Sequence, residues 1–212
     1  MTEDVAFYTA LAGESAGPIV ELAVGTGRVA IPLARETGRA IIGLDASPAM
    51  LETARARAAE AEVRLALVQG DMREIALEEP AGLVYCPFRS LLHLPTWADK
   101  RRVFERVAAA LRPGGRFAWN AFVFDYRIAA ANEGYHDAGA TSHTVEHSPA
   151  DNRIDLTLAR GGKISLWWVT RSEWEGLIDV AGLEVEALYG WFDRRPFDEA
   201  SREFVWVARK PA

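Results

Sequence analysis

The feature that most constrains the fold is a glycine turn between a short apolar run and a helix-like segment, in the stretch VELAVGTGRVAIPL at residues 20–33. Residues 19–24 form the apolar run, which predicts a buried strand. Gly25 and Gly27 predict a tight turn, and residues 28–35 predict a helix. A turn without Cβ atoms lets backbone N–H groups and a helix N-terminus approach a ligand closely. We therefore expect a polar small molecule to bind at this turn.

Three acidic residues narrow the choice of ligand. The turn fits the dinucleotide fingerprint G-x-G-x-x-A, which is a weak signal alone. Asp45 ends a second predicted strand, where a carboxylate can accept from both hydroxyls of a ribose, and Asp71 follows a third, where it can accept from an adenine amino group. Glu21 lies inside the first strand, where a carboxylate suits an ammonium group better than a pyrophosphate. Ammonium, ribose and adenine occur together in S-adenosylmethionine (SAM).

Four motifs, in this order and spacing, resemble the class I SAM-dependent methyltransferases, and most closely the branch that acts on small molecules. They are ELAVGTGR, GLDASPAML, VQGDM and LRPGG, which are specific together and not singly. The resemblance covers residues 5–125 well and the C-terminal part fairly well. One departure is Ala23, where the family usually has glycine. Alanine is the mildest replacement, so cofactor binding is still expected.

The resemblance implies a Rossmann-like α/β fold with a seven-stranded, mostly parallel sheet, flanking helices and one antiparallel edge strand. A helix is expected over residues 97–111 and the fifth strand over residues 116–124. The polar segment after this strand, followed by alternating segments and a Gly-Gly turn, predicts a small antiparallel β lid inserted there. We divide the chain into three parts. These are a SAM-binding core (residues 1–124), the lid insertion (residues 125–169) and a C-terminal completion of the core sheet (residues 170–212).

The resemblance also assigns the cofactor contacts. Gly25 and Gly27 would give backbone access, and the N–H of Met72 would donate to an adenine ring nitrogen. Met50 would either touch the adenine or pack in the core. Tyr8, in a predicted amphipathic helix over residues 2–12, would either fold over the cofactor or hold the helix down. The predicted contacts are Tyr8, Glu21, Ala23, Gly25, Gly27, Arg28, Asp45, Ala46, Met50, Asp71, Met72, Cys86 and Phe88.

Catalysis is harder to locate, because methyl transfer from a sulfonium mainly requires a close and aligned nucleophile. His93 is the candidate base, since its segment follows the fourth strand and should lie near the transferred methyl group. A structural histidine is the alternative. His143 and His147 fall on one face of a predicted strand, whereas Glu146 falls on the other. No metal site is predicted, and solvated lid histidines are preferred.

Aromatic residues in the insertion are candidates for an acceptor pocket, together with one arginine: Tyr126, Arg127, Trp167 and Trp168. Alternation places the two tryptophans on opposite faces, so we expect at least one to hold the lid on the sheet. Cys86 ends the fourth strand, but it has no basic partner nearby in the sequence. Buried packing is therefore preferred to a nucleophilic role.

Composition excludes several classes of protein. Half of the 212 residues are apolar, which suits one domain with a modest addition. The net charge is −6 and no basic stripe is visible, so nucleic acid is not expected as a partner. The single cysteine excludes an intrachain disulfide and indicates a reducing compartment. With no signal peptide or membrane-length apolar run, we expect a cytoplasmic monomer or homodimer that does not bind membranes.

The predicted function is direct methyl transfer from SAM to an N or O atom of a small molecule, with S-adenosyl-L-homocysteine (SAH) as product. One alternative is an NAD-dependent oxidoreductase, based on the glycine fingerprint and Asp45. The other is a SAM-binding protein without catalysis, in which the cleft above residues 88–93 would be closed or filled.

Overall fold

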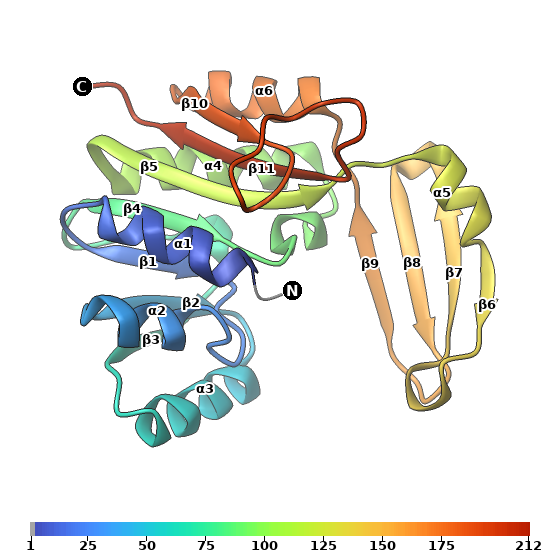
Figure 1. Cartoon of the computed structure of the whole chain (residues 1–212), viewed down its shortest axis with the longest axis horizontal. Coiled ribbons are helices and arrows are strands. Elements are labelled where there is room, and N and C mark those ends of the chain that lie inside the picture. The colour runs from blue at the N-terminus through green and yellow to red at the C-terminus, as the bar shows by residue number, and fades with distance from the viewer. Residues whose placement is uncertain (1–2) are drawn as a thin grey trace.

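The structure, a computed structural model that describes residues 3–212, contains two β-sheets and flanking helices (Figure 1). The larger sheet has seven strands in the order β10-β11-β5-β4-β1-β2-β3, and the smaller has four in the order β6-β7-β8-β9. The strands are β1 (Ile19–Leu22), β2 (Ile41–Asp45), β3 (Leu65–Gln69), β4 (Ala81–Cys86), β5 (Leu111–Phe122), β6 (Gly134–His136), β7 (His143–Ser148), β8 (Arg153–Leu158), β9 (Lys163–Trp167), β10 (Glu184–Tyr189) and β11 (Glu203–Arg209). The α-helices are α1 (Glu3–Gly13), α2 (Ala30–Thr37), α3 (Pro48–Glu60), α4 (Trp97–Ala110), α5 (Tyr126–Ala131) and α6 (Arg171–Val180).

The predicted seven-stranded, mostly parallel sheet is confirmed. Strands β1 to β5 pair in parallel, and β11 is antiparallel to both of its neighbours, β5 and β10. The expectation of an antiparallel edge strand is wrong, because β10 forms the edge and β11 lies inside it. The physical reason is the short return from β10 to β11 through residues 190–202. A connection without a crossover helix joins strands in antiparallel orientation.

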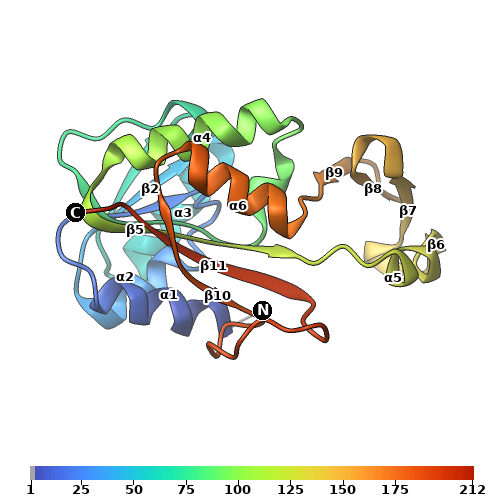
Figure 2. The same ribbon diagram turned by 90° about the horizontal axis from the view of Figure 1, so that it is seen from above.

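Two layers of helices cover the larger sheet (Figure 2). Apolar residues of α1, α2 and α3 pack in one core cluster, on one face, and those of α4 and α6 pack in a second cluster on the other. None of the helices in the described part of the chain is both long and apolar enough to span a membrane.

Local signals set the helix ends. Ser47 caps α3 by accepting from Met50 N, and Pro48 occupies its first position, as Ser47-Pro48 predicts. Thr170 and Glu173 form the predicted capping box of α6. Gly38 ends α2 with a φ of 68°.

The fifth strand differs from the prediction at both ends, since it spans Leu111–Phe122 rather than residues 116–124. Leu111 already pairs with Ala81, and after a shift in register Arg116 pairs with Leu83. The glycine turn between these pairs is absorbed into the strand as a bulge, with Gly114 at a φ of 72°. The preceding helix therefore ends at Ala110. The alternation of side chains begins only after the bulge, which is why the sequence indicates a later start.

The smaller sheet lies beyond the carboxyl end of β5 and is antiparallel throughout (Figure 1). Strands β7, β8 and β9 agree with the predicted alternation and the predicted Gly-Gly turn. Sequence reasoning missed α5 and β6, which are short and carry little periodicity. Asp125 caps α5 by accepting from Arg127 N at 2.9 Å.

Candidate functional site

The glycine turn after β1 is held by the carboxylate that ends β2. Gly25 N donates to Asp45 Oδ2 at 2.8 Å, and Ser47 N donates to Asp45 Oδ1 at 2.8 Å. Asp45 thus joins the turn to the first residues of α3. Parallel pairing of β1 with β2 brings these segments side by side.

Three residues of the turn have left-handed backbone conformations, with φ of 54° at Ala23, 55° at Gly25 and 78° at Gly27. Glycine adopts this conformation without steric cost, whereas the Cβ of Ala23 is strained in it. A Cβ on Gly27 would lie 2.8 Å from Ile31 Cδ1, so this glycine serves packing against α2. A Cβ on Gly25 would meet nothing closer than Ala23 O at 4.0 Å. The space in front of Gly25 is therefore open, as a bound nucleoside requires.

The three predicted acids lie at or just beyond the carboxyl ends of three neighbouring strands, β1, β2 and β3. Glu21 is the β-sheet partner of Gly43, two residues before Asp45, and Asp45 is the partner of Gln69, two residues before Asp71. Residues two apart on a strand share a face, so Glu21 and Asp45 project from the same face of the sheet. The geometry suits a ligand that lies across the strand ends from β1 to β3.

Glu21 is the most perturbed acid of this group. Its side chain is only 2% exposed and accepts a 2.8 Å hydrogen bond from Tyr85 Oη. Burial raises the pKa of Glu21 to about 8, although the hydrogen bond from Tyr85 and the charge of Arg28 lower it. A cationic group bound beside Glu21 would favour its ionised form.

Helix α1 is clamped onto the turn by an ion pair that sequence reasoning missed. Arg28 Nη2 lies 2.6 Å from Oδ2 of Asp4, whose side chain is fully buried. The Arg28 guanidinium also lies 5.0 Å from the ring centroid of Phe88. Phe88 is exposed and has a φ of 59°, so the backbone after β4 directs this ring toward the turn region.

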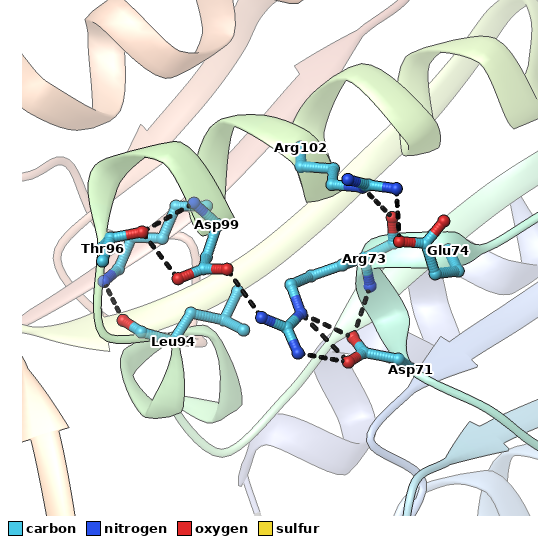
Figure 3. A network of polar contacts seen from close by, with 8 residues as sticks. Asp71, Arg73, Glu74, Leu94, Thr96, Asp99 and Arg102 are labelled. Atoms are coloured by element: carbon cyan, nitrogen blue, oxygen red, sulfur yellow. Dashed lines mark hydrogen bonds and ion pairs between the residues drawn. The ribbon is translucent and has the colours of Figure 1, made fainter.

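Asp71 belongs to a polar network that extends to α4 (Figure 3). Arg73 Nη2 lies 2.6 Å from Asp71 Oδ2, and Arg73 Nη1 lies 2.7 Å from Asp99 Oδ1. The hydrogen bonds from Arg73 lower the pKa of Asp71, which keeps it ionised near neutral pH. Both its oxygens already accept from Arg73, so an adenine would share an acceptor that is held in place.

A second polar network is buried below α1. Tyr8 is fully buried, with its ring centroid 5.0 Å from that of Tyr85, and its Oη donates to Asn120 Oδ1 at 3.3 Å. Asn120 Nδ2 donates to Glu203 Oε1 at 2.6 Å, and Arg89 Nη2 lies 2.7 Å from Glu203 Oε2. The structure therefore shows Tyr8 packing the helix down. Contact between Tyr8 and the cofactor stays a prediction.

The remaining predicted cofactor residues lie around the same strand ends. Ala46 and Met50 are exposed near the start of α3, and Met72 begins the short 3₁₀ turn η1 (Met72–Glu74). Cys86 is fully buried, and burial raises the pKa of its thiol. This environment opposes a nucleophilic role. Among residues 3–212 there is no group of three or more His, Cys, Asp or Glu side chains that could hold a metal ion.

A largely apolar cavity of about 360 Å³ lies between the end of β5 and the smaller sheet. Its apolar wall comes from both sides, with Phe122 and Phe124 from the core and Val145, Ile154 and Leu156 from the smaller sheet. Its polar lining includes Arg89, Asp125, Asn132, His147 and Arg202. The size and lining suit a small molecule with an apolar body.

Of the four residues predicted to line an acceptor pocket, two line a hollow beside the cavity and two line neither space. Tyr126 and Arg127 line a neighbouring hollow of about 530 Å³ that shares Phe124 and Asp125 with the cavity. Trp167 and Trp168 line neither. Trp168 is buried and stacks on Phe124, with ring centroids 3.8 Å apart, so it holds the smaller sheet against the core, as expected for at least one tryptophan.

His93 ends the 3₁₀ turn η2 (Ser90–His93), which lies against β9. It is an exposed residue and lines neither the cavity nor the neighbouring hollow. Partial desolvation lowers the pKa of His93, against the effect of a backbone hydrogen bond with Ser165. Its catalytic role stays a prediction.

Comparison with known proteins agrees with this geometry. Residues 19–115 match the family model described as "Methyltransferase domain". The chain is 27% identical to a dTDP-4-amino-2,3,4,6-tetradeoxy-D-glucose N,N-dimethyltransferase from Saccharopolyspora spinosa, over 81% of this chain and 73% of that protein. It is 30% identical to 27-O-demethylrifamycin SV methyltransferase from Amycolatopsis mediterranei, over 80% of this chain and 54% of that protein. Two further curated relatives are matched over only 27% and 41% of their length.

The fold resembles that of the CcbJ methyltransferase from Streptomyces caelestis, with a TM-score of 0.82 and 27% identity over 100% of this chain and 94% of that one. The sheet order, with the glycine turn and the acids at successive strand ends, defines a Rossmann-like fold. More specifically, residues 19–115 match a methyltransferase domain and the whole chain shares the fold of the CcbJ methyltransferase, so the chain is similar to the class I SAM-dependent methyltransferases.

Proposed function

We propose that this protein binds SAM at the glycine turn and transfers its methyl group to an N or O atom of a small molecule. The placement of Glu21, Gly25 and Asp45 around one turn supports SAM most directly. Glu21 would hold the methionine ammonium, Asp45 the ribose, and Asp71 with Met72 the adenine. When bound, SAM supplies a methyl group on a sulfonium, whose departure leaves the electron pair on sulfur.

The cavity between β5 and the smaller sheet is the proposed acceptor site. It lies at the carboxyl edge of the parallel strands, where ligands bind in open α/β sheets. An open cavity at this position favours catalysis over SAM binding alone. The relatives named above include one N- and one O-methyltransferase, so we propose either atom as the acceptor. The smaller sheet would then serve as the lid of this site.

Glu21 also favours SAM over a dinucleotide as the ligand of this turn. An ammonium bound beside this buried acid would be stabilised by ionisation of Glu21, whereas the pyrophosphate of NAD would gain no such attraction and would be repelled whenever Glu21 is ionised. Cytoplasmic location, action as a monomer or homodimer, and the absence of nucleic acid and membrane partners are further parts of this proposal.

Two experiments test the proposal in sequence. Calorimetry with SAM, SAH and NAD should show binding of the first two and none of NAD. A panel of amino sugars, benzylamine and 4-methylphenol, with tritium-labelled SAM, should then give methylated product. No binding of SAM or SAH would overturn the proposal, and binding without transfer to any acceptor would favour a non-catalytic role.

A further inference from the structure

We propose that His147, positioned by Glu133, is the base that takes the proton from an acceptor bound in the cavity beside β5. This inference rests on the proposed function. His147 Nδ1 contacts a carboxylate oxygen of Glu133, and the His147 side chain is only 11% exposed. His147 lines the cavity, and so does its cross-strand partner Ile154.

The contact with Glu133 fixes which ring nitrogen is available. An ionised carboxylate only accepts hydrogen bonds, so Nδ1 must carry the proton and Nε2 keeps its lone pair. The hydrogen bond from His147 lowers the pKa of Glu133, which keeps that carboxylate ionised. Glu133 does not line the cavity, whereas His147 does. Of this pair, only His147 borders the acceptor space.

The other three histidines lack this arrangement. His143 also belongs to β7, but its Nδ1 contacts the carbonyl oxygen of Thr141 and its ring stacks on His136, with centroids 5.3 Å apart. Neither His143 nor His136 lines the cavity, and His93 lies outside it as well. Of the histidines, all of which fall within residues 3–212, only His147 combines a carboxylate partner with a place in the cavity wall.

The proposed step balances without a further reactant. The acceptor N or O atom forms its bond to the methyl carbon, and the sulfonium C–S bond breaks with its electron pair on sulfur. The N–H or O–H proton passes to Nε2 of His147. The imidazolium that results is stabilised by Glu133 and later releases its proton to solvent. Glu133 is thus a positioning residue, and His147 is the catalytic one.

The first test is nitrogen NMR of the whole protein, labelled with ¹⁵N-histidine and saturated with SAH. The His147 signals are assigned by their loss in His147→Gln. We expect the Nδ1–H tautomer in the wild type, a mixture of tautomers in Glu133→Ala, which has no acceptor, and recovery in Glu133→Asp. An Nε2–H tautomer in the wild type, or no change in Glu133→Ala, would overturn the positioning of His147 by Glu133.

The second test compares rates with the fastest acceptor of the panel. We expect His147→Gln to lose about 100-fold or more in rate, as for other general bases, and the matched control His143→Gln to keep the wild-type rate. A rate for His147→Gln equal to that of the control would overturn the catalytic role. SAH binding to each variant separates the two proposals. If His147→Gln binds SAH normally and keeps the wild-type rate, only the catalytic role of His147 is refuted. If the wild type does not bind SAH, both the proposed function and the role of His147 are refuted.

Discussion

Tyr85 on β4 donates a 2.8 Å hydrogen bond from its phenolic oxygen to the carboxylate of Glu21 on the neighbouring strand β1, and both side chains are almost completely buried. The two residues are direct partners in the parallel sheet. A tyrosine hydroxyl can donate to a neutral or an ionised carboxyl group, so the bond survives a change in the charge of Glu21. The burial around this pair is the main reason why the pKa of Glu21 rises to about 8.

SAH binding at pH 7 should therefore release a proton. Below its pKa Glu21 is mostly neutral, and an ammonium bound beside it would favour the carboxylate. Calorimetry in phosphate and in Tris buffer should give heats that differ by the ionisation enthalpies of the buffers, with a release approaching one proton per SAH. Glu21→Gln should remove this difference. Equal heats for the wild type in both buffers would contradict the link between Glu21 and the ammonium.

Folding stability should depend on the same group. The pKa of Glu21 is raised in the folded state, so between pH 5 and 8 the folded protein holds a proton that the unfolded chain releases. The free energy of unfolding should thus fall as pH rises, by at most about 1.4 kcal/mol per pH unit from this group. Urea unfolding of the wild type and Glu21→Gln from pH 5 to 8 measures the slope.

The comparison with Glu21→Gln is necessary because His93 changes the free energy of unfolding with pH in the opposite direction. The lowered pKa of His93 means that the folded state binds fewer protons near pH 6, which makes stability rise with pH there. Both proteins contain His93, so its contribution cancels in their difference. Parallel stability curves over the whole range would show that Glu21 is ionised in the folded protein.

Gly25→Ala should weaken SAH binding more than it weakens the fold. The new Cβ would project into the open space in front of the turn, and we expect at least a tenfold loss of affinity, about 1.4 kcal/mol. Gly38→Ala is the matched control, since Gly38 has a φ of 68°, has no atom within 4 Å of its Cβ position and lies at the far end of α2. Both variants carry the cost of alanine in a left-handed conformation. Equal SAH affinities in the two variants would place the ligand elsewhere.

How far the sequence predicts the site depends on whether a signal is local. The glycine turn and the acids Glu21, Asp45 and Asp71 were found because each follows or interrupts a recognisable apolar run. Asn120 and Glu203 were missed, although they are fully buried and hydrogen-bonded to each other. Each is a single polar residue in an apolar strand. Only the order β11-β5-β4-β1 shows that these residues and Glu21 lie at one end of one sheet.

Residues 125–169 also show that local sequence patterns do not reveal tertiary contacts. Alternation correctly places Glu146 on the face opposite His147, which led the sequence reasoning to discard a carboxylate partner. The partner is Glu133, between α5 and β6, in a segment without periodicity. Tertiary contacts of that kind leave no pattern along the chain. The placement of α5 and β6 is what supplies the acidic group.

Ala23→Gly should stabilise the protein. Ala23 has a φ of 54°, and alanine in the left-handed region costs roughly 1 kcal/mol that glycine avoids. The gain is reduced by the larger entropy of an unfolded chain with glycine, so we expect a net rise of up to about 1 kcal/mol in the free energy of unfolding. Urea unfolding at pH 7 measures it. Ala56→Gly, at an exposed position inside α3, is the control and should lose about 1 kcal/mol, because its backbone is helical. A loss of stability in both variants would mean that the strain at Ala23 is absent.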